Sequence, residues 1–280
     1  MAGRSEVAPR GYFADLGSLT VGALARLVRE PSHSRRAEAK RRSARYALVL
    51  TAVLACVIVL LMFVVDAYEI SLMPKRGTPS LWPVKILTDF GKSQYVLWAL
   101  GLSFVPVLLV LPRLSGASRA TMIGIGTRLQ YLFLAVLVPV LAGEVIKGVI
   151  GRGRPFVGGS ADPFNFAPFS WTEAYASMPS GHSTTAGAVA FAVAALWPRL
   201  RGVMMVYLMV ILLSRLVLLA HHPSDVVAGA LLGIVGAMAV RYWFAARRLA
   251  FTIRADGRID PLAGPGWDRV KRVARDALAP

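Results

Sequence analysis

The chain has 280 residues, of which 56% are hydrophobic and only 17% are charged. A soluble domain usually carries about 25% charged residues, and here the apolar residues are gathered into long blocks. Together these features exclude an ordinary soluble globular domain and indicate an integral membrane protein. The formal net charge of +17 would suit a nucleic-acid-binding protein, but nothing beyond the charge supports that partner, so we expect no nucleic acid.

The apolar blocks predict six transmembrane helices, because a hydrocarbon core of about 30 Å needs roughly 20 apolar residues of helix. Apart from Arg241 near the end of the last block, only Glu144 and Arg215 are charged within these blocks. The first block is too long for a signal peptide and lacks a clear cleavage site, so we expect it to be retained. We predict an all-α polytopic membrane protein with one six-helix domain over residues 46–245. The spans are Tyr46–Val65, Tyr95–Leu111, Leu129–Ile146, Ser183–Trp197, Val203–Ala220 and Val226–Phe244.

The basic residues are distributed unevenly between the two sides that this topology creates. If the N-terminus is cytoplasmic, 24 of the 32 lysines and arginines fall on the cytoplasmic side, which is the positive-inside pattern. Both termini are then basic cytoplasmic tails, residues 1–45 and 246–280, of a protein in a bacterial inner membrane.

Three shorter segments carry apolar residues at helical spacing outside the predicted spans. Residues 12–29 fit either a short interfacial helix or a disordered basic tail, and residues 267–275 fit a helix slightly better. Pro83–Ser93 predicts a short amphipathic helix between the first two spans, since proline suits a first helical turn.

The alternating topology brings three polar segments to one side of the membrane, the periplasmic side. These are the end of the third span, the start of the fourth, and the junction of the fifth and sixth. Three of the four histidines, His182, His221 and His222, lie there. The loop over residues 148–179 joins the first two segments and is rich in aromatic residues, which favour either the bilayer interface or packing against the helix ends.

The charged groups at this end describe a site for a phosphate. Lys147, Arg154 and Arg215 supply three cations, and a charge inside a span such as Arg215 is functional by default. Ser180 is a good N-cap, so the N–H groups of Gly181 and His182 form an anion seat at the start of the fourth helix. A carboxylate would leave this set overcharged, whereas a phosphoryl group carrying about two negative charges fits it.

Two histidines make chemistry at this site plausible. Asp225 follows His221 by four residues, and a carboxylate on one ring nitrogen leaves the other free to attack. His182 has a suitable pKa to protonate a departing alkoxide. No acidic cluster with metal-ligand spacing appears here, and three fixed cations can stabilise the developing charge, so we expect neither a metal nor another cofactor.

These residues form three motifs that resemble the signature of the type 2 phosphatidic acid phosphatase (PAP2) superfamily. They are Lys147-x6-Arg154-Pro155, Pro179-Ser180-Gly181-His182 and Ser214-Arg215-x5-His221-x3-Asp225. The resemblance implies a PAP2-type helical bundle and metal-independent catalysis. It implies His221 as the nucleophile of a phosphohistidine intermediate, Asp225 as its orienting partner and His182 as the general acid. The phosphoryl group would be bound by Lys147, Arg154, Ser180, Gly181 and Arg215.

Three neighbouring residues receive more ordinary interpretations. We expect Glu144 to form an ion pair with Lys147, one helical turn away. Arg152 lies between motif positions and is interpreted as a surface or lipid-phosphate contact. His222 is interpreted as a packing residue or a headgroup contact.

The motifs predict a lipid phosphatase that hydrolyses a phosphate or pyrophosphate headgroup. Candidate substrates are phospholipid phosphates such as phosphatidate and phosphatidylglycerol phosphate, the isoprenoid undecaprenyl pyrophosphate, and the lipid A phosphates. The alternative is a lipid phosphotransferase, in which another lipid captures the same phosphohistidine. A binding protein that kept only the fold would be expected to have lost His182, His221 or Asp225.

Overall fold

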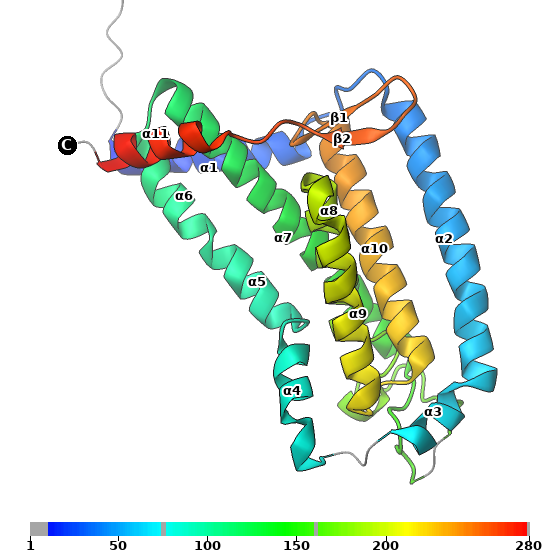
Figure 1. Ribbon diagram of the computed structural model, residues 1–280. Helices are drawn as coiled ribbons and strands as arrows, with labels where there is room; N and C mark the ends of the chain where they lie inside the picture. Colours follow the sequence, from blue (N-terminus) through cyan, green and yellow to red (C-terminus); the bar gives the residue numbers. More distant parts are fainter. Residues whose placement is uncertain (1–10, 74–76, 160–161, 279–280) are drawn as a thin grey trace, which may run out of the picture.

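The computed structural model describes residues 11–73, 77–159 and 162–278, so the first ten residues of the predicted N-terminal tail lie outside the described parts. The described chain is almost entirely helical (Figure 1). Its one sheet is the antiparallel pair β1–β2. The α-helices are α1 (Tyr12–Val28), α2 (Arg36–Val64), α3 (Asp66–Leu72), α4 (Trp82–Asp89), α5 (Ser93–Leu102), α6 (Phe104–Val110), α7 (Gly116–Ile150), α8 (Gly181–Leu196), α9 (Arg201–Val217), α10 (Pro223–Ala246) and α11 (Trp267–Leu278). The strands are β1 (Phe251–Ile253) and β2 (Ile259–Pro261), and the 3-10 turns are Pro79–Leu81, Leu111–Arg113, Glu173–Tyr175 and Pro198–Leu200.

Five helical segments of the described chain are long and apolar enough to cross a membrane. They correspond to five of the six predicted spans, so the all-α polytopic fold is confirmed. The predicted fourth span is α8, which has only 16 residues, so helix length does not confirm the count of six. Ten residues of α8 are buried among its neighbours, and a helix enclosed by protein need not match the full bilayer thickness. The five segments are Arg36–Val64, Ser93–Arg113, Gly116–Ile150, Pro198–Val217 and Pro223–Ala246.

Helices α8 and α10 form the centre of the bundle and approach each other through glycines. A methyl group added at Gly187 would lie 2.6 Å from the carbonyl oxygen of Ala230, and one at Gly233 would lie 2.1 Å from that of Thr184. Small residues allow such close backbone contact in membrane helices, where dispersion and polar contacts replace the hydrophobic effect. This contact fixes the start of α8 against the start of α10, where the site lies.

The close approach at Gly233 makes a stability prediction. Gly233→Ala should destabilise the fold by about 1–3 kcal/mol, because the added methyl group forces the two helices apart. At Gly101, in α5, an added methyl group meets no atom within 4 Å. Gly101→Ala should therefore be neutral or stabilising, since alanine favours helix over glycine by about 1 kcal/mol. Thermal unfolding of both variants in detergent checks the prediction, and equal melting temperatures would contradict it.

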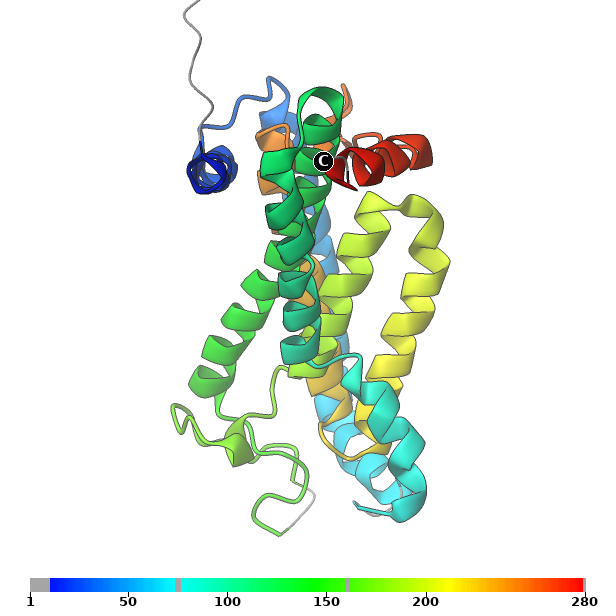
Figure 2. The same cartoon turned by 90° about the vertical axis from the view of Figure 1, so that its left-hand side faces the viewer.

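Helices near both ends of the chain gather at one end of the bundle. Helices α1 and α11 lie across that end, roughly perpendicular to the bundle (Figures 1 and 2). Tyr12 donates a hydrogen bond to the carbonyl of Leu109 at 2.8 Å, and the indole of Trp243 donates to the carbonyl of Leu27 at 2.9 Å. The helical interpretation therefore holds for residues 12–28 and 267–278, and α4 confirms the short helix before the second span.

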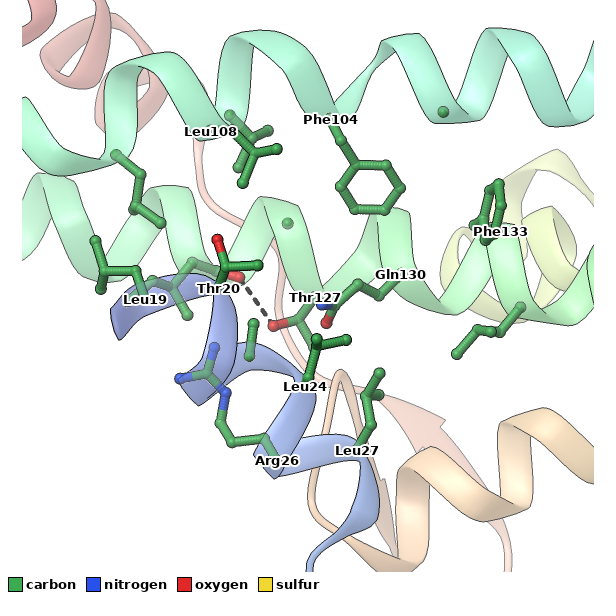
Figure 3. A pocket seen from close by; sticks show the side chains of 17 residues that line it. Leu19, Thr20, Leu24, Arg26, Leu27, Phe104, Leu108, Thr127, Gln130 and Phe133 are labelled. Atoms are coloured by element: carbon green, nitrogen blue, oxygen red, sulfur yellow. Dashed lines mark hydrogen bonds between the residues drawn. The ribbon is translucent and has the colours of Figure 1, made fainter. Parts of the chain in front are cut away.

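The two contacts at the ends of α1 hold it above an apolar cavity between α5, α6 and α7. The cavity has a volume of about 380 Å³. Leu24 of α1, Phe104 of α6 and Phe133 of α7 are among the side chains that line it (Figure 3). The opposite end of the bundle carries the predicted site.

Candidate active site

The predicted site residues meet where α7 ends, α8 begins and α9 turns into α10. The long loop between α7 and α8 crosses the same end, as do α3 and α4 (Figure 1). Helix α7 stops because Gly151 adopts a left-handed conformation, with φ at 58°. A methyl group there would lie 1.9 Å from the carbonyl oxygen of Ala167, so the loop can turn back over the helix end only if residue 151 is glycine.

Lys147 and the start of α8 lie side by side. Ser180 occupies the N-cap position of α8, and its backbone N–H donates to the carbonyl of Asp225 at 3.0 Å. A methyl group added at Gly181 would lie 3.1 Å from Nζ of Lys147, so the cation borders the positive end of the helix. Glu144 accepts a hydrogen bond from Lys147 at 2.5 Å, as the sequence predicted.

The two arginines of the motifs are held by groups outside the motifs. Arg215 is only 8% exposed and donates to the hydroxyl of Thr88, in α4, at 2.9 Å. Arg154 donates its backbone N–H to the carbonyl of Ala174 at 2.9 Å, and its guanidinium lies 3.6 Å from the carboxylate of Glu173. Helix α4 and the long loop therefore help to place the cations.

His221 is buried at the centre of these charges. Its Nδ1 lies 2.9 Å from the carbonyl oxygen of Ser177. Burial lowers the pKa of His221 well below its ordinary value, and the positive charges of Arg215, Arg154 and Lys147 lower it further. The imidazole is therefore neutral near neutral pH, which is the form that carries a lone pair for attack.

The second histidine, His182, lies in the first turn of α8. Among the described residues its Nε2 is buried without a hydrogen-bond partner. The turn after α4 passes close by, since a methyl group at Gly91 would lie 3.5 Å from Cβ of His182. An imidazole nitrogen in this position is available to a bound substrate.

The comparisons with known proteins agree with this arrangement. The PAP2 superfamily model matches residues 128–249. A lipid A 1-phosphatase of Rhizobium johnstonii is 33% identical over 228 residues, covering 80% of this chain and 90% of that protein. The chain belongs to the PAP2 superfamily. A second lipid A 1-phosphatase, from Rhizobium etli, is 34% identical over 197 residues, or 70% of this chain and 81% of that protein.

The superfamily resemblance is thus confirmed, and with it the enzyme class, a membrane hydrolase of lipid phosphates. No solved structure shows a significant match to the chain. Within the described ranges no cluster of three or more His, Cys, Asp or Glu side chains is arranged to hold a metal ion. The roles of the individual site residues remain predictions.

The structure of this PAP2 protein differs from the sequence interpretation at Arg152. That side chain is fully buried, not a surface or lipid contact. Its guanidinium donates to Asp225 Oδ1 at 2.6 Å and to Asp66 Oδ2 at 2.8 Å. Asp66 follows the first span directly, and its separation from Arg152 by 86 positions gave no sequence signal that the two residues meet.

Asp225 also binds differently from the expectation. Its Oδ2 lies 3.9 Å from Nδ1 of His221, beyond hydrogen-bonding distance. Instead Oδ2 accepts from the hydroxyl of Ser177 at 2.6 Å and from the backbone N–H of His222 at 3.0 Å. The groups in contact with Nδ1 are the carbonyl of Ser177 at 2.9 Å and, at 3.5 Å, the hydroxyl of the same residue, which sequence reasoning missed. His222 itself is fully buried, which fits the packing interpretation rather than a headgroup contact.

Glu69, in α3, predicts how stability depends on pH. Both of its carboxylate oxygens are buried without a hydrogen-bond partner in the described structure. Burial, and then the charge of Asp66, raise the pKa of Glu69 from 4.5 to about 7. Between these two values the folded protein binds more protons than the unfolded chain, so stability falls as pH rises through this window.

Glu69→Gln removes this titration while keeping the side-chain shape. The variant should melt a few degrees higher than the wild type at about pH 8, and the difference should vanish near about pH 4. Melting temperatures across that range check the prediction. A wild type and variant that differ by the same amount at every pH would contradict it.

Proposed function

We propose that the protein removes the 1-phosphate of lipid A, or of a closely related glycolipid, through a phosphohistidine formed on His221. The observation that carries the proposal is the geometry of His221, a buried imidazole whose Nδ1 lies 2.9 Å from the Ser177 carbonyl. Burial and the charges of Arg215, Arg154 and Lys147 lower its pKa and so favour the neutral, nucleophilic form. The names of the two curated relatives support the choice of lipid A among the lipid phosphates.

The first half of the reaction is attack by Nε2 of His221 on phosphorus. Lys147, Arg154 and Arg215, with the N–H groups at the start of α8, stabilise the charge on the phosphoryl oxygens. The bond between phosphorus and the glycosyl oxygen breaks, and His182, which takes up a proton when the anionic phosphoryl group binds beside it, gives that proton to the oxygen. The dephosphorylated lipid leaves, and the phosphoryl group stays on His221.

The second half is hydrolysis of the phosphohistidine. Neutral His182 takes a proton from a water molecule, and the water oxygen attacks phosphorus from the side opposite the imidazole. The P–N bond breaks, inorganic phosphate leaves, and His221 and His182 return to their starting states. Three fixed cations supply the charge that metal ions supply elsewhere, so the reaction is proposed to be metal-independent.

The location of the site supports a reaction on the periplasmic side of the inner membrane. The site lies at the end of the bundle opposite to α1 and α11 (Figures 1 and 2). In the proposed topology α1 and α11 belong to the basic regions that the positive-inside rule places in the cytoplasm. The lipid A phosphate would then be cleaved in the outer leaflet of that membrane.

The test is phosphate release by the purified protein in detergent, measured with and without EDTA. The substrates are lipid A, phosphatidate, phosphatidylglycerol phosphate and undecaprenyl pyrophosphate. We expect release from lipid A, and a product that has lost the phosphate at the 1-position. Release from another lipid alone would overturn the substrate, and loss of activity in EDTA would overturn metal independence. Phosphate recovered on a second lipid instead of in solution would identify the protein as a phosphotransferase.

A further inference from the structure

A chain of hydrogen bonds runs from His221 through Ser177 to two residues that are not signature positions of the family motifs, Arg152 and Asp66. We propose that Arg152 and Asp66 are positioning residues, which hold the imidazole of His221 in its attacking tautomer by fixing the Ser177 carbonyl. This inference rests on the proposed role of His221 as nucleophile.

The first link is between His221 and Ser177. A carbonyl oxygen only accepts hydrogen bonds, so Nδ1 of His221, at 2.9 Å from it, must carry the proton. Nε2 then keeps the lone pair that attack on phosphorus requires. The position of one peptide group thus determines both the tautomer and the direction of the ring.

The second link holds Ser177 from two sides. Its backbone N–H donates to the carbonyl of Arg152 at 3.0 Å, and its hydroxyl donates to Asp225 Oδ2 at 2.6 Å. Arg152 in turn donates to Asp225 Oδ1 at 2.6 Å. Arg152, Asp225 and Ser177 therefore form a closed ring of contacts, and Arg152 contributes to it with both its backbone and its side chain.

The third link is the guanidinium of Arg152, which uses all five of its N–H donors. Nη1 donates to Ser224 Oγ as well as to Asp225, both at 2.6 Å. Nη2 donates to Asp66 Oδ2 and to the carbonyl of Pro163, both at 2.8 Å, and Nε donates to the same carbonyl at 3.0 Å. Only a planar five-donor group makes this set of bonds, so lysine is no substitute for arginine here.

The last link is Asp66, which anchors the guanidinium to two helices. Its carboxylate accepts from Arg152, from the Ser224 backbone N–H at 3.0 Å and from the Ser224 hydroxyl at 2.5 Å. Ser224 lies in the first turn of α10, and Asp66 opens α3, so the carboxylate joins the first span to the helix that carries Asp225. Asp66, Arg152 and Asp225 are all fully buried.

A purely structural ion pair is the competing explanation, and energetics argue against it. A buried ion pair often adds no more stability than apolar residues of the same volume. The bonds of these three residues instead converge on the hydroxyl and backbone N–H of Ser177, the residue whose carbonyl contacts Nδ1 of His221. A positioning role therefore explains the pattern of bonds, whereas helix anchoring alone would not require the pattern to end at Ser177.

The test uses Asp66→Asn, which keeps the side-chain shape and removes one charge. Two quantities are measured, the kcat and KM for the lipid substrate, and the tautomer of His221 from nitrogen NMR of protein labelled only at its four histidines. We expect kcat to fall about 10–100-fold with KM nearly unchanged, as for other residues that orient a functional side chain without touching the substrate. The His221 signals should change from the Nδ1–H tautomer to a mixture.

A matched control makes the same change at the far end of the protein. Asp276 accepts a hydrogen bond from Ser118 at 2.5 Å, so Asp276→Asn also removes one charge and one hydroxyl contact. It should leave kcat and the His221 signals as in the wild type. Folded Asp66→Asn with wild-type kcat and an unchanged tautomer would overturn the inference.

Two further arms cover the other outcomes. If Asp66→Asn does not fold, Ser177→Ala decides, because it keeps the backbone carbonyl, removes the hydroxyl bond to Asp225 and the 3.5 Å contact of that hydroxyl with Nδ1 of His221, and should still lower kcat and disturb the tautomer. The NMR measurement needs no substrate, so a wild type inactive on every lipid would refute the proposed function and still leave the positioning decided. Full activity in His221→Ala would overturn the function and the inference together.

Discussion

His221→Ala should lower phosphate release by at least about 10⁴-fold, to the background of the assay, because removal of a nucleophile leaves only binding and charge stabilisation. The variant should still bind inorganic phosphate as a competitor, since Lys147, Arg154, Arg215 and the start of α8 remain. Phosphate dissociation constants from calorimetry and turnover from phosphate release, measured on the same preparation, separate the two effects.

The control is a histidine at the other end of the molecule. His33 accepts a hydrogen bond from the backbone N–H of Ile253 at 3.2 Å, far from the cations of the site. His33→Ala should retain wild-type turnover even if it melts somewhat lower. Turnover in His221→Ala within about tenfold of the wild type would mean that the imidazole is not the nucleophile, since loss of such a group costs several orders of magnitude.

The fold was predictable where hydrophobicity identifies the helix segments that contact lipid. Long apolar runs located the five long spans, but a run of apolar residues marks only the part of a helix that meets hydrocarbon. Helix α2 begins at Arg36, ten positions before the predicted span, because the arginines, alanines and lysine of residues 36–45 are good helix formers in water. In α8 the opposite holds, since its short apolar run suffices where neighbouring helices surround it.

The site was predictable where the side chain itself has a chemical signature. Histidines, a serine N-cap and three cations at one end of the predicted bundle were enough to propose a phosphate site. The motif separated Arg154 from Arg152, two positions earlier, but nothing in the sequence indicated that the Arg152 side chain is buried. Arg152 is fully buried between two aspartates, whereas Arg154 remains partly exposed at the site. Only the fold decides which of them turns inward.

Backbone groups were the least predictable part of the site. The Ser177 carbonyl contacts Nδ1 of His221, and every residue type carries such a carbonyl. A serine three positions before a predicted N-cap gave no reason to single it out. The sequence therefore assigned the orienting role to Asp225 alone. In the structure the Asp225 carboxylate accepts a hydrogen bond from the Ser177 hydroxyl, and the Ser177 carbonyl contacts the imidazole of His221.

Asp225→Asn should lower kcat by about 10³–10⁴-fold with little change in KM, comparable to the loss of a carboxylate that fixes a catalytic histidine. The carboxylate accepts three hydrogen bonds, from Arg152, from the Ser177 hydroxyl and from the His222 backbone N–H. The asparagine side chain has an NH₂ group in place of one carboxylate oxygen. This NH₂ group must face at least one of the three donors, so that hydrogen bond is lost and two donors repel each other. The Ser177 peptide then loses its position, and with it the tautomer of His221.

The size of the decrease in kcat shows whether Asp225 orients His221 through Ser177 or has no orienting role. Asp225→Asn keeps Arg152 paired with Asp66 but leaves at least one buried donor unsatisfied, so the free energy of unfolding should fall by about 1–3 kcal/mol. The fold must therefore be confirmed by melting temperature before kinetics are compared. A folded variant that keeps more than a tenth of wild-type kcat would show that Arg152 and the backbone alone hold Ser177. The orienting function would then belong to Arg152 rather than to the motif aspartate.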